Sequence, residues 1–338
     1  MTDKKTTTTP PQSDLFGDDK DPSKLAEALG ERMKGKRPAP PKKPTRSEKL
    51  IRTGILIEDE APTGGSVGYM HAVLSQIGLP RRKVQERSFT RKNGGAVLLI
   101  EAGSIWDGRK MIEQPLPYGP KPRVMMADLF TYAIKNKTRV IDLGNSVSEY
   151  LRRLGYTNQG GTRGPLTAFR KQAQALAACH MTLGVNYGGQ AHTITGKPIK
   201  KFSAWLDTQG QQKTMWPATL ELSPDFWESL QEFAVPLDMR AVHSLSASAL
   251  ALDLYTALAH RLHRLNKPLY LHWASIKDQF GQEYQKTKDF RRAFVVQLRA
   301  VLVAYPGAKV REVKGGLMLY PSPPPISKNQ FFIHSNGG

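Results

Sequence analysis

Three features of this 338-residue sequence predict an α+β fold with two tandem winged-helix domains and a disordered N-terminal tail. Residues 286–320 read as a basic amphipathic helix, a Pro-Gly break and a basic hairpin, which is the order of the DNA-reading part of a winged helix. A similar order of elements occurs once more upstream. Residues 1–50 are rich in Thr, Pro, Lys and Asp and carry no periodic apolar pattern.

The pattern divides the chain into two tails and two domains. We expect an N-terminal tail over residues 1–50 and a C-terminal tail over 327–338. Between them, the first domain is expected to cover residues 51–234 and the second domain 235–326. One apolar island, formed by Gln12, Leu15 and Phe16, interrupts the polar N-terminal tail. Apolar anchors in a flexible segment can fill a pocket on a partner protein, so we expect a docking peptide here.

The first domain is predicted to contain both helices and short strands. Its predicted helices carry apolar residues at steps of three and four and cover 67–77, 123–137, 146–154, 165–180 and 226–233. Its predicted strands lie between turn residues and cover 85–92, 96–101, 139–143, 182–187, 199–207 and 218–222. Asn145 or Ser146 can cap the third of these helices, and Pro165 occupies the favoured first position of the fourth.

The second domain is predicted to repeat the winged-helix order in a shorter form. After a connector at Pro236, we expect a helix over 246–265 and a strand over 269–272. Two helices, over 275–280 and 287–305, and a hairpin over 309–320 follow. The last helix has Phe290, Phe294 and Leu298 on one face, and Pro306-Gly307 ends it. Thr287 is the candidate cap of this helix.

A short repeat supports duplication of one module. The tetrapeptide Asp128-Leu-Phe-Thr131 recurs as Asp253-Leu-Tyr-Thr256, each time in the middle of a predicted helix. The order of elements around the two copies also agrees. We therefore interpret the chain as two related modules.

The formal net charge of +20 indicates a polyanionic partner, and for such a chain we expect nucleic acid. A helix fits the major groove of duplex DNA, and a hairpin reaches an adjacent phosphate. The candidate DNA-binding residues in and before the helix of the first module are Arg163, Thr167, Arg170, Lys171 and Gln174. Those of the second module are Lys286, Lys288, Arg291, Arg292, Arg299, Lys309, Arg311 and Lys314. Because such contacts release counterions, affinity should fall steeply with salt.

No pattern in the sequence indicates an enzyme, a metal site or a cofactor. His260 and His263 could form a metal pair, but no further ligands lie near them, and we interpret both as exposed helix residues beside phosphate.

The only cysteine, Cys179, lies in an apolar run and fits a buried residue of a protein in the reducing cytoplasm. No apolar run is long enough for a membrane span. Phe202 and Trp205 alone are a weak indication of RNA binding.

Several motifs in a fixed order resemble those of the RepA-type plasmid replication initiators, between about Gly68 and Ile326. The motifs that carry the resemblance are LPYGPKPR at 116–123, DLGNSVSEYL at 142–151, LELSPDF at 220–226, VPLDMRA at 235–241, ALDLY at 251–255, DFRR at 289–292 and LYPSPP at 319–324.

This resemblance implies a protein that binds repeated double-stranded sites at a plasmid origin, opens an adjacent AT-rich region and recruits host replication proteins. It also implies homodimers that repress their own gene. Gln12, Leu15 and Phe16 then resemble the peptide with which some plasmid initiators dock to the sliding clamp. A tandem winged-helix transcriptional repressor without initiator activity remains the alternative. Direct repeats beside an AT-rich tract in the neighbouring DNA would favour initiation, and a lone inverted repeat in a promoter would favour regulation.

Overall fold

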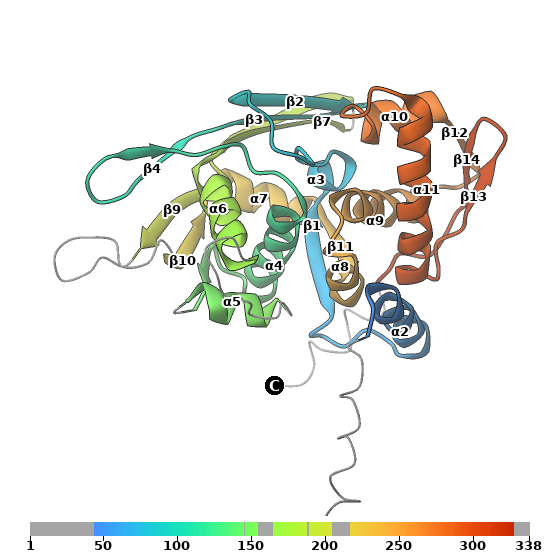
Figure 1. Cartoon of the computed structure of the whole chain (residues 1–338), viewed down its shortest axis with the longest axis horizontal. Helices are drawn as coiled ribbons and strands as arrows, with labels where there is room; N and C mark the ends of the chain where they lie inside the picture. The colour runs from blue at the N-terminus through green and yellow to red at the C-terminus, as the bar shows by residue number, and fades with distance from the viewer. Residues whose placement is uncertain (1–43, 145, 155–164, 188, 205–216, 328–338) are drawn as a thin grey trace, which may run out of the picture. The chain divides into compact units, whose positions relative to one another are not determined.

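The computed structural model describes residues 44–144, 146–154, 165–187, 189–204 and 217–327 (Figure 1). From Thr45 onward these residues belong to one of the two units into which the chain divides. Regular structure begins earlier than expected, because helix α2 (Arg46–Asp59) starts before residue 51. Thr45 and Glu48 form a capping box, in which each side chain bonds the other's backbone N–H, at 3.2 and 2.8 Å.

The helix predicted over 67–77 is wrong in its first half. Residues Val67–His71 form strand β1, and only Ala72–Gln76 form a helix, α3. β1 pairs antiparallel with β11 (Ala234–Asp238), which occupies the connector expected at Pro236. Both strands are largely buried on both faces, so neither shows the alternation that identifies a half-exposed strand.

The first of two similar series of elements begins with α4 (Pro120–Asn136). It continues with β6 (Val140–Asp142), α5 (Val147–Arg153), α6 (Pro165–Ala178), β9 (Ile199–Ala204) and β10 (Pro217–Leu222). The three strands form an antiparallel sheet in the order β6-β10-β9. As predicted, Ser146 caps α5 by accepting a hydrogen bond from the Glu149 N–H at 3.1 Å.

A second antiparallel sheet combines two strands that precede this series with two that are inserted between α6 and β9. It has the order β2-β3-β7-β8 and consists of β2 (Ser88–Asn93), β3 (Ala96–Glu101), β7 (His180–Tyr187) and β8 (Gln190–Gly196). Strand β8 was not predicted, because its residues are mostly exposed and polar and therefore lack an apolar pattern. A small hairpin, β4 (Ser104–Trp106) and β5 (Met111–Glu113), follows β3.

The second series repeats the order of the first without inserted strands. After α7 (Pro224–Glu232) and β11, it consists of α8 (Met239–Leu245), α9 (Ala249–Arg261), η1 (Leu262–Arg264), β12 (Leu269–His272), α10 (Trp273–Phe280), α11 (Thr287–Ala304), β13 (Val310–Val313) and β14 (Gly316–Leu319). Its sheet has the order β12-β14-β13. This matches β6-β10-β9, because in both sheets the last strand lies between the first and the second.

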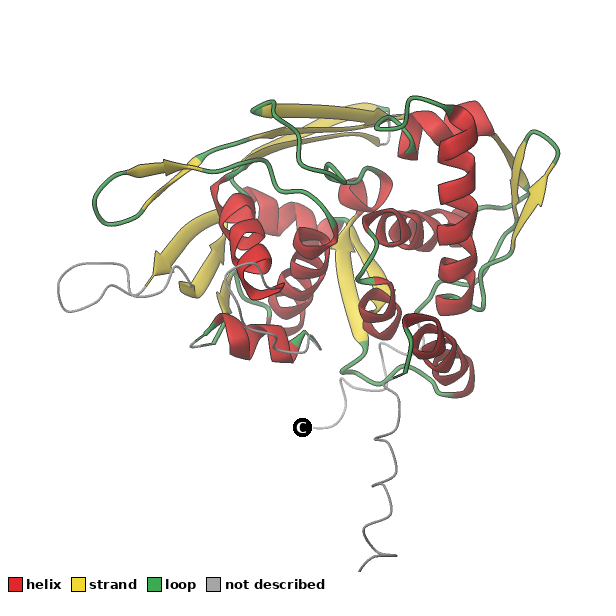
Figure 2. Ribbon diagram, viewed as in Figure 1, coloured by secondary structure: helices red, strands yellow, loops and turns green. Residues whose placement is uncertain are grey.

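The repeated tetrapeptides lie in α4 and α9, where each anchors one of the two central strands. Thr131 of α4 accepts a hydrogen bond from the Tyr69 N–H of β1 at 2.9 Å. Tyr255 of α9 accepts one from the Asp238 N–H of β11 at 2.8 Å. In Figures 1 and 2, β1 runs between α4 and α6 on one side and α8 and α9 on the other. The two series therefore meet along the β1–β11 pair.

Helix α2 lies against the second series, although its residues precede the first. It packs on α8 and α11. Gly54 lies so close to the backbone of Val303 that a larger residue would collide with it. Arg240 of α8 donates hydrogen bonds to the carbonyl groups of Leu56 and Glu60 at the end of α2, at 3.4 and 3.2 Å.

Candidate nucleic-acid interface

Helix α11 has one buried apolar face and one exposed basic face. Phe290, Phe294 and Leu298 are buried in the core, as their spacing predicts. The candidate residues on the helix and just before it are all exposed, namely Lys286, Lys288, Arg291, Arg292 and Arg299. The expected cap differs: Lys286, and not Thr287, is the N-cap residue, and no side chain caps the helix. The first N–H groups of α11 therefore have no side-chain acceptor among the described residues.

The hairpin β13–β14 stands beside α11 (Figure 1). Its three candidate residues, Lys309, Arg311 and Lys314, are exposed on or next to the hairpin. Arg291 joins the helix to the hairpin: its Nε and Nη2 atoms donate to Glu312 Oε1 of β13 at 3.2 and 2.7 Å. Its guanidinium also lies 5.2 Å from the centre of the Trp273 ring. Arg291 thus fixes the hairpin relative to α11, besides adding charge.

The remaining cations of this face are weakly paired within the described chain. Arg292 Nη2 lies 3.8 Å from Asp289 Oδ1, one turn earlier on the same helix. Both side chains are largely exposed, so water screens this pair and it contributes little. Arg299 has no ion-pair or hydrogen-bond partner in the part of the chain that the structure describes. These guanidiniums can therefore bind an external anion.

Helix α6, the corresponding helix of the first series, is covered over its C-terminal half. Lys171 is exposed, and Thr167 and Arg170 are partly exposed. Gln174 was expected to face outward, but this is wrong, because only 7% of it is exposed. Gln172, on the same helix, is also buried, and its Oε1 accepts a hydrogen bond from the Tyr118 N–H at 2.7 Å. Among the described side chains of α6, only those of Thr167, Ala168, Arg170 and Lys171 remain at least partly exposed.

Four candidate residues lie outside the described residues, namely Arg163, Gln12, Leu15 and Phe16. Their proposed roles stay predictions.

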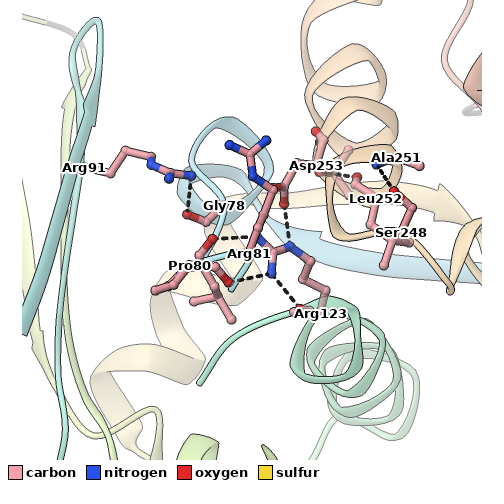
Figure 3. A network of polar contacts seen from close by, with 12 residues as sticks. Gly78, Pro80, Arg81, Arg91, Arg123, Ser248, Ala251, Leu252 and Asp253 are labelled. Carbon is pink, nitrogen blue, oxygen red and sulfur yellow. Dashed lines mark hydrogen bonds and ion pairs between the residues drawn. The ribbon is translucent and has the colours of Figure 1, made fainter. Parts of the chain in front are cut away.

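A buried polar network lies between the two series (Figure 3). Arg123 of α4 donates to both carboxylate oxygens of Asp253 of α9, at 2.6 and 2.9 Å, and each side chain is 5% exposed. Arg123 also donates to the carbonyl groups of Leu79 and Gly119 at 2.6 and 2.7 Å. This one guanidinium thus connects both series with the loop that follows α3.

The same loop supplies a basic pair that was not among the predicted DNA-binding residues. Arg82 and Lys83 are exposed, and the Arg82 guanidinium lies 5.9 Å from the centre of the Tyr284 ring, just before α11. The run Arg-Arg-Lys at 81–83 is visible in the sequence. Its position beside a helix about 200 residues later follows only from tertiary packing.

The histidines do not form the exposed pair that was expected. His260 is buried, and its Nε2 accepts a hydrogen bond from Arg264 Nη1 at 2.6 Å. Burial, together with Arg264 and Arg261, lowers the pKa of His260 to about 3, so it is neutral and cannot serve as a cation beside phosphate. Among the described residues, no group of three or more His, Cys, Asp or Glu side chains could hold a metal ion.

Cys179 is fully buried, as its apolar surroundings predicted. Burial raises the pKa of its thiol to about 12, which keeps it protonated and unreactive. In the described part of the chain, no helix combines the length and apolar composition of a membrane span.

One family model matches part of the chain. Residues 116–273 match the family model of the plasmid-encoded RepA protein, which confirms the family resemblance seen in the sequence motifs. No curated protein matches the chain. Two crystal structures of domains 2 and 3 of RctB are similar at 12% sequence identity. The first has a TM-score of 0.47 and covers 74% of this chain and 97% of the RctB chain; for the second these values are 0.44, 73% and 94%.

Proposed function

We propose that this protein, whose residues 116–273 match the plasmid-encoded RepA family, is a plasmid replication initiator that binds repeated double-stranded sites at an origin. The observation that carries the proposal is the exposed basic face of α11 beside the basic hairpin β13–β14. In the proposed complex, α11 enters the major groove and the hairpin reaches the neighbouring phosphates. The protein then promotes opening of an adjacent AT-rich region and recruits host replication proteins.

Each series of elements is proposed to be a winged-helix module. In support, both have the order helix, strand, helix, helix and two strands, and both sheets place the last strand in the centre. The two modules would contribute unequally to DNA binding. The C-terminal half of α6 is buried, so the first module would present mainly Lys171 and the residues before it. The second module would supply most of the electrostatic affinity.

Further parts of the proposal concern partners. Gln12, Leu15 and Phe16 are proposed to dock to the host's sliding clamp, and homodimers would repress the protein's own gene. The protein would act in the cytoplasm, without a cofactor or catalytic activity. A clamp pull-down tests the first of these: Leu15→Ala with Phe16→Ala should abolish capture, and unchanged capture would refute the role of the tail.

Footprinting of the DNA that flanks the gene, together with a plasmid-maintenance assay, tests the initiator proposal. We expect protection of direct repeats beside an AT-rich tract, and loss of the plasmid when the gene is deleted and not supplied in trans. The alternative, a tandem winged-helix repressor, predicts protection of a lone inverted repeat in a promoter and normal maintenance without the protein. The second result would overturn the proposal.

A further inference from the structure

The loop that follows α3 is fixed to the segment just before α11 by an enclosed ion-pair cluster. The backbone N–H of Arg81 donates to Glu283 Oε1 at 3.0 Å, and its Nε donates to Oε2 at 2.7 Å. Arg91 of β2 adds a bond from Nη2 to Glu283 Oε1 and one from Nε to Gln282 Oε1, each at 3.2 Å. Three donors from the loop after α3 and from β2 thus converge on one carboxylate of the second series.

This cluster is shielded from water. The side chains of Arg81 and Arg91 are almost completely buried, and that of Glu283 is 18% exposed. Burial alone would raise the pKa of Glu283, but the adjacent guanidiniums of Arg81 and Arg91 outweigh it and keep the pKa below its usual value. The carboxylate is therefore charged and fully engaged at neutral pH. Breaking such a pair from one side is costly, so the loop is held firmly in place.

The next two residues of the loop point their charge outward. Arg82 packs beside the ring of Tyr284, and Lys83 follows it; both are exposed. Tyr284 precedes Lys286 and Lys288, which are exposed at the start of α11. Two exposed cations from the loop after α3 therefore lie near the segment that leads into α11, one of them beside Tyr284.

We infer that Arg82 and Lys83 contact the phosphate backbone of the same duplex that α11 binds, and that Glu283 is the positioning residue that holds them there. This inference rests on the proposed DNA-binding function. The choice of duplex DNA as occupant follows from charge complementarity, because the extended face presents Arg82, Lys83, Lys286 and Lys288 together. The DNA surface of the second module is thus composite, and a fragment that begins at β11 would lack part of it.

Salt dependence of binding measures these contacts directly. In the full-length protein, the slope of log Kd against log salt concentration should decrease by about 2 in Arg82→Ala with Lys83→Ala, since each phosphate contact contributes roughly 0.9. Fluorescence anisotropy with a labelled duplex that carries a site protected in the footprint gives this slope. Both residues are exposed, so the variant should fold normally.

A matched control removes two exposed cations elsewhere. Arg46 and Arg52 lie on α2, which packs beside Val303, roughly 24 Å along α11 from its first residue at 1.5 Å per residue. Arg46→Ala with Arg52→Ala should keep the wild-type slope. Glu283→Gln retains Arg82 and Lys83 but loses the carboxylate charge, and we expect it to lower the slope as the double variant does.

The outcomes separate the inference from the function. A wild-type protein that binds DNA without steep salt dependence would refute the proposed function itself. If the wild type binds as proposed, two results would overturn the inferred contacts. The first is a wild-type slope in the variant Arg82→Ala with Lys83→Ala. The second is a decrease of the slope in this variant that is no larger than the decrease in the α2 control. A wild-type slope in folded Glu283→Gln would overturn the positioning role of Glu283.

Discussion

Asp253→Asn replaces a buried carboxylate by a neutral group of the same shape, and we expect this to destabilise the protein. Asp253 accepts two hydrogen bonds from Arg123, and both side chains are 5% exposed. In this variant the Arg123 guanidinium stays buried without its counter-ion, and the carbonyl groups of Leu79 and Gly119 that it also bonds carry no charge. Leaving a buried charge without its counter-ion costs about 3–5 kcal/mol of the free energy of unfolding.

Urea denaturation followed by circular dichroism measures this change as a lower midpoint. The exposed pair Arg87–Glu113, with side chains 51% and 75% exposed, supplies the control. Glu113→Gln should cost less than about 1 kcal/mol. Replacing both partners, as Arg123→Met with Asp253→Leu, should be less harmful than Asp253→Asn, because no unpaired charge remains. Equal midpoints for Asp253→Asn and Glu113→Gln would refute the reasoning.

Three further outcomes are expected. Arg292→Ala with Arg299→Ala should leave the unfolding midpoint unchanged and lower the salt slope of DNA binding by about 2, in the same anisotropy assay. The pKa of His71 is lowered by burial from 6.5 to about 4, so the unfolded chain takes up its proton first. Stability should therefore fall as the pH drops from about 6.5 towards 4, and urea titrations of His71→Gln should show a flatter pH profile. Cys179 should resist a thiol reagent at pH 8 in the native protein and react fully in denaturant, as absorbance of the released thiolate would report.

The parts of the fold that the sequence predicted well are those with strong local signals. Helix α11 combines a buried apolar face with a Pro306-Gly307 stop, and the hairpin after it turns beside Gly315. Both signals act over a few residues, so they survive in any tertiary context. The strand β1 lacks such a signal. Its residues are buried on both sides by β11 and α4, which the local pattern cannot reveal.

Some features of the candidate interface could likewise be predicted from the sequence, and others depend on the tertiary structure. The net charge, the duplicated order of elements and the exposed basic face of α11 were determined by the sequence itself, because they depend on composition and on periodicity within one helix. Only the tertiary structure decided that Gln174 is buried and that Arg291 bonds Glu312. The same packing places Arg82 beside Tyr284. The exposure of a helix face depends on which distant segment packs against it, and ion pairs form between residues that only the fold brings together.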